Sequence, residues 1–346
     1  MFRRINCFLF LISLVLLSFY FTGLSLMEKT KNYQKENDRL LLREVRKKVK
    51  INTLRSSTVH QSSHQKVEAR LEARRKNMLK SCVHYKRNLS IPMDVAFVNH
   101  PSLKASLFFS DKYKLLLCEI PKCASTNQAK FLTMAEGLLT KEESVKLPSI
   151  RATTIAHRKL SARQAKNIFQ ISKRMKTYTS LVIVREPFSR LLSAFRNKLE
   201  NNSRSDGYSR LGNRIHRSYS VENNTQTNET SYDTNVTFAE FAKYLTNPIH
   251  LPISDPHWKF YEGLCAPCAL KYNFIVHLDT LQEDMDFIVK KLNIKNTYFP
   301  PSYDSFTDHK KVEKYYNGIP SDTLNALYRT YKIDYDLFGF STPYGV

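Results

Sequence analysis

The chain has 346 residues, of which 42% are hydrophobic and 12% aromatic, so it can bury a sizeable core and is not disordered throughout. Its net charge of +23 favours an anionic partner, such as a nucleotide, a sulfated or uronic glycan, a nucleic acid or a membrane surface. Residues 28–87 carry 18 Lys and Arg against 6 Asp and Glu, so just over half of the excess lies ahead of the motifs described below.

An apolar run without a charged residue covers residues 7–26, and Arg3 and Arg4 precede it. About 20 apolar residues suffice to cross a bilayer as a helix. The positive charges ahead of the run favour a cytoplasmic tail of residues 1–6 and a single-pass type II membrane protein. The alternative is a cleaved signal peptide with its small-residue site at Gly23–Ser25. In both cases the remainder of the chain enters the secretory pathway, where a nucleic-acid partner is not expected.

The charged segment 27–87 is predicted to be a stem, partly helical and partly disordered, ahead of a lumenal domain over residues 88–346. Five N-x-S/T sequons support the lumenal placement, and four of them fall in a stretch rich in Asn, Ser and Thr that reads as a surface insertion. The predicted glycosylation sites are Asn88, Asn201, Asn223, Asn228 and Asn235.

Apolar runs and helical periodicity alternate along the lumenal segment. Such alternation predicts an α/β fold with a parallel sheet flanked by helices. The expected strands are residues 115–120, 180–184 and 272–277, and the expected helices are residues 128–139, 161–173, 189–199 and 280–292. Ligands of parallel sheets bind at the carboxyl ends of the strands, and two polar loops, 121–127 and 185–193, leave such ends.

The first of these loops has the composition of an anion site. It combines Lys122 with the hydroxyls of Ser125 and Thr126, directly before a helix whose first-turn amides and dipole favour negative charge. The plain alternative is an ordinary strand-to-helix turn with a surface lysine. The glycines of an ATP-binding GxxxxGK(S/T) loop are absent, which disfavours an ATP-dependent kinase.

Five cysteines lie after the apolar run 7–26, namely Cys82, Cys118, Cys123, Cys265 and Cys268, and an odd number leaves at least one expected to be free in an oxidising compartment. Cys265 and Cys268 have CxxC spacing, but no second ligand pair for zinc and no thioredoxin context accompanies them. They are expected to form structural disulfides, with Cys82 or with each other.

The two loops together resemble those of the membrane-bound carbohydrate sulfotransferases, in the group of the chondroitin and dermatan 4-O-sulfotransferases and the HNK-1 sulfotransferase. The family pattern C-x-(V/I)-P-K-x-x-x-T-N appears at Cys118–Asn127, and V-R-(D/E)-P-F-x-R-L-x-S-A-(Y/F)-R-(N/D)-K appears at Val184–Lys198. Further similarity around Trp258–Tyr272 and Tyr335–Phe340 extends the resemblance over most of the lumenal segment. The resemblance implies a sulfotransferase fold, with a P-loop-NTPase-like parallel sheet behind the transmembrane helix and stem.

The resemblance also implies a co-substrate, 3′-phosphoadenosine 5′-phosphosulfate (PAPS), without a metal. Lys122 is the candidate cation at the phosphosulfate bridge, and Ser125 and Thr126 would hold the 5′-phosphate. Arg185 and Ser193 would bind the 3′-phosphate. The full set of residues carried over from the two motifs is Pro121, Lys122, Cys123, Ala124, Ser125, Thr126 and Asn127, with Arg185, Glu186, Pro187, Phe188, Ser189, Arg190, Leu191, Leu192 and Ser193.

A base must take the proton of the acceptor hydroxyl, and histidine suits proton removal near neutrality. His157 ranks first because its place ahead of the second motif is similar to that of the catalytic histidine in related uronyl 2-O-sulfotransferases. His257 ranks second and Glu186 third, the latter with a structural pairing to Arg190 or Arg196 as its alternative. Basic residues that could follow a polyanionic acceptor are Arg158, Lys159, Arg163, Arg204, Arg210 and Arg214.

The family analogy favours a Golgi membrane enzyme that sulfates the 4-hydroxyl of N-acetylgalactosamine in chondroitin or dermatan. Sulfation of another acceptor, such as the 3-hydroxyl of glucuronate on glycoprotein glycans, is the first alternative. A non-catalytic glycan-binding relative is the second, although Lys122, Arg185 and Ser193 are all retained. The sequence leaves the oligomeric state open.

Overall fold

The computed structural model describes residues 64–87, 102–165, 167–200, 206–220, 236–250, 255–301, 309–343 and 346. The predicted span 7–26 and all five predicted glycosylation sites lie outside these ranges. No helix within the described ranges is both long and apolar enough to cross a membrane. The chain divides into units Met1–Gln65 and Lys66–Val346, and everything below concerns the second unit.

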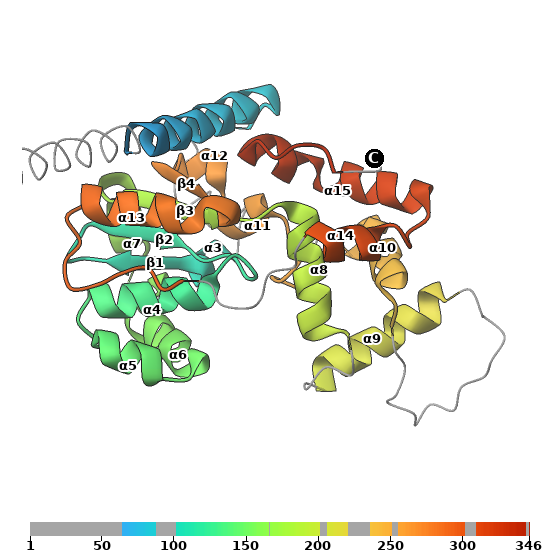
Figure 1. Ribbon diagram of the computed structural model, residues 1–346, viewed down its shortest axis with the longest axis horizontal. Helices are drawn as coiled ribbons and strands as arrows, with labels where there is room; N and C mark the ends of the chain where they lie inside the picture. Colours follow the sequence, from blue (N-terminus) through green and yellow to red (C-terminus); the bar gives the residue numbers. More distant parts are fainter. Residues whose placement is uncertain are drawn as a thin grey trace, which may run out of the picture. The chain divides into compact units, whose positions relative to one another are not determined.

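A four-stranded sheet with the order β1-β2-β3-β4 forms the centre of this unit (Figure 1). Its strands are β1 (Leu107–Ser110), β2 (Leu115–Cys118), β3 (Thr179–Val184) and β4 (Phe274–His277). β2, β3 and β4 are parallel, as predicted, whereas the edge strand β1 pairs antiparallel with β2. The sequence did not predict β1, which adds an antiparallel edge strand to the parallel sheet. A short turn joins β1 to β2, whereas parallel pairing would need a crossover connection.

Alternate residues of the strands face opposite sides of the sheet, and helices cover both sides. Leu117 and Ile183 pack with the helices of one side, and Leu116 and Val182 with those of the other. On the side of Leu117 and Ile183, the sheet is covered by α4 (Ser125–Ala135), α6 (Ser149–Lys159) and α13 (Leu281–Lys291), with α5 (Lys141–Lys146) beside α4. On the side of Leu116 and Val182, it is covered by α7 (Ile168–Thr177), α11 (Tyr261–Cys265) and α12 (Pro267–Leu270), with α3 (Leu103–Ser106) beside α11.

Five further helices share a second, aromatic-rich core. Phe188 stacks on Tyr316 with ring centroids 4.6 Å apart, and Trp258 meets Phe241 edge-on at 5.3 Å. These helices are α8 (Pro187–Lys198), α9 (Asp206–Tyr219), α10 (Phe238–Thr246), α14 (His309–Tyr316) and α15 (Ser321–Phe338). Short 3-10 helices complete the described elements: η1 (Ala162–Gln164), η2 (Pro248–His250) and η3 (Leu278–Thr280). Because α8 starts directly after β3, this helical core meets the sheet at the carboxyl end of that strand.

A helix over residues 64–84, which the sequence assigns to the stem, packs within the same compact unit as the sheet. Its Arg70 and Arg74 pair with the fully buried carboxylate of Asp284 at 2.5 and 2.7 Å. Val67 and Leu71 join the core on one side of the sheet, and Met78 and Cys82 join the core on the other. The helix thus lies along β4, the outermost strand, and covers an edge that would otherwise be open to pairing.

Two disulfides fix this arrangement, and both use cysteines of the CxxC sequence. Cys82 is bonded to Cys268, and Cys118 is bonded to Cys265. The expectation of structural disulfides is confirmed, with Cys82 rather than the neighbouring cysteine as the partner of Cys268. Cys123 is free and buried, in agreement with the odd number of cysteines after the apolar run 7–26.

Removing the Cys82–Cys268 bond by a double substitution to alanine is expected to lower the free energy of unfolding by about 2–5 kcal/mol. Because the Cys118–Cys265 bond lies inside the loop between Cys82 and Cys268, removing Cys82–Cys268 frees the unfolded chain mainly over residues 82–118. Thermal unfolding of the oxidised wild type and the variant measures the effect. An unchanged midpoint would show that the helix over residues 64–84 is held by its other contacts alone.

Several predicted helices begin or end elsewhere, with identifiable local causes. α4 starts at Ser125 rather than 128, and it ends early because Gly137 adopts a positive φ of 74° and closes a C-terminal turn. The single helix expected over 161–173 is wrong: η1 and α7 occupy that region, and the side chain of Asn167 caps α7 by accepting from the amide of Gln170.

Candidate active site

The loop after β2 turns sharply into α4. Lys122 and Ala124 both have positive φ values, 71° and 56°, and the side chain of the N-cap residue Ala124 provides no cap for the helix. The amides of Ser125 and Thr126 belong to the first turn, where an α-helix offers no acceptor of its own. The loop therefore presents first-turn amides and two hydroxyls at the positive end of the α4 dipole, which suits an anion.

Two side chains of this region are used to hold the loop. Gln128 donates from Nε2 to the carbonyl of Cys123 at 2.6 Å, within the buried interior. Asn127 donates from Nδ2 to the carbonyls of Pro300 and Pro301, at 2.9 and 3.2 Å. Asn127, carried over as a co-substrate contact, thus ties the start of α4 to a neighbouring segment, while Cys123 lies buried beneath the loop.

Lys122 and Arg185 lie where β2 and β3 end, and Lys198, at the end of α8, is close enough for its charge to act on Lys122. Burial, together with the charges of Lys198 and Arg185, lowers the pKa of Lys122 to about 8. Burial likewise lowers the pKa of Arg185, whose side chain is 6% exposed. No carboxylate of the described residues forms an ion pair with any of the three. A half-buried group of cations without acidic partners is a site prepared for a polyvalent anion.

The lowered pKa of Lys122 predicts a pH effect on the unliganded protein. The folded chain releases this proton near pH 8 and the unfolded chain near pH 10.5, so the unfolded chain binds more protons between these values. Stability relative to Lys122→Met should therefore rise with pH through that window. Thermal unfolding of both proteins across it measures the difference, and parallel pH profiles would contradict the burial of a charged Lys122.

Arg185 reaches the same edge as Lys122 because β2 and β3 are parallel neighbours, with Cys118 opposite Val182. The backbone of Arg185 is held on both sides by Tyr261, whose hydroxyl donates to its carbonyl at 2.5 Å and accepts from its amide at 3.3 Å. Ser193 lies on α8, two turns further, and is partly exposed. Two loops that are distant in sequence are thus brought together at one end of the sheet.

Glu186 has a structural role, as the N-cap of α8, that differs from the arginine pairing considered from the sequence. Its carboxylate accepts from the amides of Phe188 and Ser189, at 3.0 and 2.6 Å, and also from the hydroxyl of Tyr335. The alternative pairing with Arg190 or Arg196 is not what the structure shows, since Arg196 pairs with Glu200 and Arg190 donates to backbone carbonyls. Because Glu186 occupies the N-terminus of α8, an anion beside this helix would be bound by side chains rather than by the first-turn amides.

Arg190 is buried and connects the loop after β2 to the segment that precedes α11. Its guanidinium donates to the carbonyls of Pro121, Lys259 and Pro256, at 3.1, 2.8 and 2.8 Å, and stacks over the ring of Tyr261. The other motif residues of this helix are structural too: Pro187 is the first residue of α8, and Phe188, Leu191 and Leu192 lie in the aromatic core. Arg190 thus joins the loop after β2, through Pro121, to the segment that carries His257, through Pro256.

The two candidate histidines differ in how they are held. His157, on α6, is 40% exposed, and its Nε2 lies 3.3 Å from Glu119. His257 is partly buried, and its Nδ1 lies 2.6 Å from Oδ1 of Asp255. All hydrogen bonds of the His257 ring to described residues use Nδ1, which leaves Nε2 for another partner. A carboxylate on Nδ1 is the arrangement that orients an imidazole as a general base.

Asp255 is itself firmly placed. It accepts from the backbone amide of His257 at 2.8 Å and from the hydroxyl of Tyr208 at 2.9 Å. Burial alone would raise the pKa of Asp255, but these hydrogen bonds and the imidazole hold it below its usual value. Asp255, Tyr208 and Lys198 are the site residues that the sequence interpretation missed, although Asp255 stands only two residues before a candidate base.

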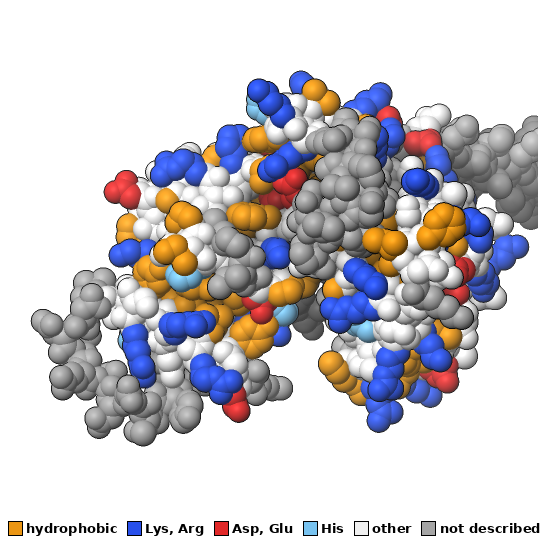
Figure 2. Space-filling model, turned by 180° about the vertical axis from the view of Figure 1, so that it is seen from behind, with side chains coloured by type: hydrophobic (Ala, Val, Ile, Leu, Met, Phe, Trp, Pro, Cys, Tyr) orange, Lys and Arg blue, Asp and Glu red, His pale blue; other side chains and the backbone are white. Residues whose placement is uncertain are grey.

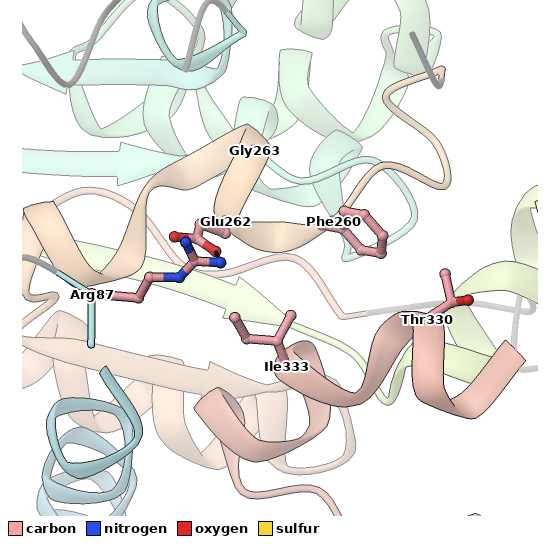
Figure 3. Close-up of a pocket in the computed structure, with 6 residues that line it drawn as sticks. All are labelled: Arg87, Phe260, Glu262, Gly263, Thr330 and Ile333. Atoms are coloured by element: carbon pink, nitrogen blue, oxygen red, sulfur yellow. Dashed lines mark ion pairs between the residues drawn. The ribbon is translucent and has the colours of Figure 1, made fainter. Parts of the chain in front are cut away.

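Other features of the surface do not coincide with these loops. A pocket of about 340 Å³ lies between α11 and α15, where Arg87 faces Glu262 at 3.1 Å beside Phe260 and Ile333 (Figure 3). Lys and Arg side chains are scattered over the face in Figure 2 rather than gathered in one patch, so charge alone does not mark an acceptor surface. Within the described ranges, no group of three or more His, Cys, Asp or Glu could hold a metal ion.

Comparisons with known proteins agree with the motifs. A family model described as "Sulfotransferase family" matches residues 105–341. Carbohydrate sulfotransferase 10 of Homo sapiens is 33% identical over 249 residues, covering 68% of this chain and 67% of that protein, and the Rattus norvegicus protein of the same name is 32% identical with the same coverage. Carbohydrate sulfotransferase 11 of Rattus norvegicus is 29% identical over 242 residues, again covering 68% of this chain and 67% of its own. No solved structure matches the chain.

The family match covers both loops, the sheet and the helical core, and the resemblance noted from the two motifs is confirmed. The chain belongs to the sulfotransferase family and is a sulfotransferase enzyme.

Proposed function

We propose that this enzyme transfers a sulfuryl group from PAPS to a hydroxyl of a glycan. The observation that carries the proposal is that Lys122 and Arg185 lie at the ends of two neighbouring parallel strands, that Lys198 at the end of α8 is close enough to act on Lys122, and that none of the three has an acidic partner among the described residues. A nucleotide with phosphates at both its 3′ and 5′ positions supplies the opposite charge at two points. The first-turn amides of α4 and the unshielded cations fit that pattern.

The two loops divide the donor between them in this proposal. Lys122, Ser125 and Thr126 bind the 5′ phosphosulfate at the start of α4, and Arg185 with Ser193 binds the 3′-phosphate. Glu186 and Arg190 are not assigned direct contacts with the donor, because both already form hydrogen bonds within the protein. They position the loops instead, and Asn127 and Gln128 do the same from the other side.

Sulfuryl transfer is an in-line displacement, so the protein contributes mainly positioning and stabilisation of charge. Lys122 stabilises the negative charge that develops on the leaving phosphate. We assign the base to His257 in preference to His157, because Asp255 holds the Nδ1 side of His257 and Arg190 ties its neighbour Pro256 to the donor loop. His257 then accepts the proton of the acceptor hydroxyl at Nε2.

Replacing Arg185 by methionine is expected to weaken the binding of adenosine 3′,5′-bisphosphate, the product nucleotide, by about 10- to 100-fold, because charge-assisted hydrogen bonds to the 3′-phosphate are lost. The unliganded variant should unfold at the same or a higher temperature, since a buried cation without an acidic partner is removed. Calorimetric titration and thermal unfolding measure the two effects. Unchanged affinity would remove Arg185 from the donor site.

The acceptor proposed first is the 4-hydroxyl of N-acetylgalactosamine in chondroitin or dermatan, with the 3-hydroxyl of glucuronate as the alternative. The names of the relatives specify only a carbohydrate. For the chain's place in the cell we propose a Golgi membrane protein of type II topology, on the apolar run 7–26 and the sequons. A lumenal, oxidising setting also suits the two disulfides.

The full-length protein, incubated with radiolabelled PAPS and a panel of desulfated chondroitin, desulfated dermatan and glucuronate-terminated glycans, tests the function. We expect label on one of these acceptors. No transfer to any glycan, with nucleotide binding intact, would favour a non-catalytic glycan-binding protein. Label on the glucuronate-terminated glycan alone would replace the first acceptor by the second.

A further inference from the structure

Tyr208 is the third residue of α9, and its side chain contacts two parts of the candidate site. Its ring lies under the ammonium group of Lys198, with Nζ 4.8 Å from the ring centroid. Its hydroxyl donates to Oδ2 of Asp255 at 2.9 Å and lies 3.3 Å from Nδ1 of His257. The ring of Tyr208 thus contacts the cation Lys198, and its hydroxyl binds Asp255, the partner of the candidate base His257.

The cation held by the ring belongs to the donor site. Lys198 is the last residue of α8, and its charge acts on Lys122 strongly enough to help lower the pKa of that lysine. No carboxylate of the described residues pairs with Lys198. A cation over an aromatic face is attracted by the ring without being neutralised, so Lys198 keeps its full charge for an anion.

The hydroxyl acts on the other side. Burial and the carboxylate of Asp255 raise the pKa of Tyr208, so the phenol keeps its proton and remains a donor. With Oδ2 occupied by Tyr208 and Oδ1 by the amide and ring of His257, both oxygens of Asp255 have partners. A carboxylate fixed at both oxygens cannot rotate away from the imidazole, which keeps Nε2 in one direction.

We propose that Tyr208 is a positioning residue that holds Lys198 and His257 at a fixed separation beside the loop after β2. This inference rests on the proposed function. The transfer requires cations at the sulfuryl donor and a base at the acceptor hydroxyl, and both must be in place in the same complex. Tyr208 contacts Lys198 through its ring and Asp255, the partner of His257, through its hydroxyl. Its two contacts can be removed separately.

Tyr208→Phe removes the hydroxyl and keeps the ring. It is expected to lower kcat roughly tenfold, the effect of one buried hydrogen bond, while affinity for adenosine 3′,5′-bisphosphate stays at the wild-type value. Tyr208→Leu removes the ring as well. It should lower kcat at least as much and also weaken nucleotide binding severalfold, because Lys198 loses its support.

The partners provide matched tests of coupling. Tyr208→Phe should add nothing to the kcat defect of Asp255→Asn, and Tyr208→Leu should add nothing to the loss of nucleotide affinity caused by Lys198→Met, since each pair acts through one contact. Tyr113→Phe is the control for losing a phenol: its hydroxyl bonds the backbone of Lys295 near the opposite end of the sheet. It should leave kcat and nucleotide affinity unchanged.

Steady-state kinetics, calorimetric titration with adenosine 3′,5′-bisphosphate and thermal unfolding of the full-length variants give the answer. A purely structural Tyr208 would lower kcat, affinity and the unfolding temperature together in both variants, and this outcome would overturn the inference. Wild-type kcat in Tyr208→Phe would overturn it as well. If the wild type transfers no sulfate to any glycan, the proposed function itself fails.

Discussion

Replacing His257 by alanine should lower kcat by about 10²- to 10⁴-fold, the usual contribution of a positioned general base. The affinity for adenosine 3′,5′-bisphosphate should remain at the wild-type value, because in the proposed mechanism the histidine acts on the acceptor hydroxyl and not on the nucleotide. The structural reason is the 2.6 Å contact between Nδ1 of His257 and Asp255, which fixes the ring and leaves Nε2 available. Steady-state rates at saturating PAPS measure the loss.

His157→Ala is the matched control for that experiment. His157 is 40% exposed and its Nε2 is already directed at Glu119, so its removal should change kcat by less than a few-fold. The reverse result, a large loss with His157→Ala and a small one with His257→Ala, would restore the ranking that the sequence alone favoured. Equal losses at matched unfolding temperatures would show that neither residue is the sole base.

Lys122→Ala should lower kcat by about 10²- to 10³-fold, as expected when a preorganised group that stabilises transition-state charge is removed. The lysine follows Pro121, whose carbonyl is fixed by Arg190, so its position is set before the substrate binds. Lys122→Arg keeps the charge but not the compact ammonium group, and it should recover only part of the activity. Lys290→Ala, at an exposed lysine of α13, controls for the general loss of positive charge.

Two results would contradict this role for Lys122. A variant with wild-type kcat and weakened nucleotide binding would make Lys122 a binding residue only. A variant with a wild-type rate and wild-type affinity would remove it from the site altogether. In both cases the positive-φ turn after β2 would need another explanation.

The sequence correctly predicted that two polar segments follow the ends of neighbouring strands, because their residues are local and specific, but residues 187–193 and 125–127 belong to α8 and α4 rather than to loops. Lys122 and Arg185 each follow an apolar run that forms a strand, and the parallel pairing of those strands follows from the helices between them. The strand β1 was missed: its residues Leu107–Ser110 are few, and the short turn before β2 was not read as a hairpin. A four-residue strand carries too little periodic signal to be recognised alone.

The roles of individual motif residues could not be read in the same way. An arginine one helical turn after Pro187 can bind phosphate or backbone carbonyls with the same guanidinium, and only the approach of Pro256 and Lys259 shows that Arg190 does the latter. Likewise, Glu186 could act as a base or as a cap. Such choices depend on segments far apart in sequence, which the local pattern does not contain.

The ranking of the histidines shows the same limit from another side. Asp255 is only two residues from His257, so a carboxylate partner could have been suspected from the sequence. Tyr208 and Lys198, in contrast, reach the site from α9 and α8, and their contacts with it exist only in the folded chain. Cys82 gives a similar example, since its disulfide partner lies 186 residues away.

The claim that two loops form one site for a doubly phosphorylated nucleotide is tested most directly by comparing two ligands. Adenosine 3′,5′-bisphosphate and adenosine 5′-monophosphate differ only in the 3′-phosphate, and calorimetric titration gives the affinity of each for the wild type, Lys122→Ala and Arg185→Met. We expect Lys122→Ala to weaken both ligands and Arg185→Met to weaken the bisphosphate alone. Equal losses for both ligands in Arg185→Met, or no loss for the bisphosphate, would contradict the two-part site.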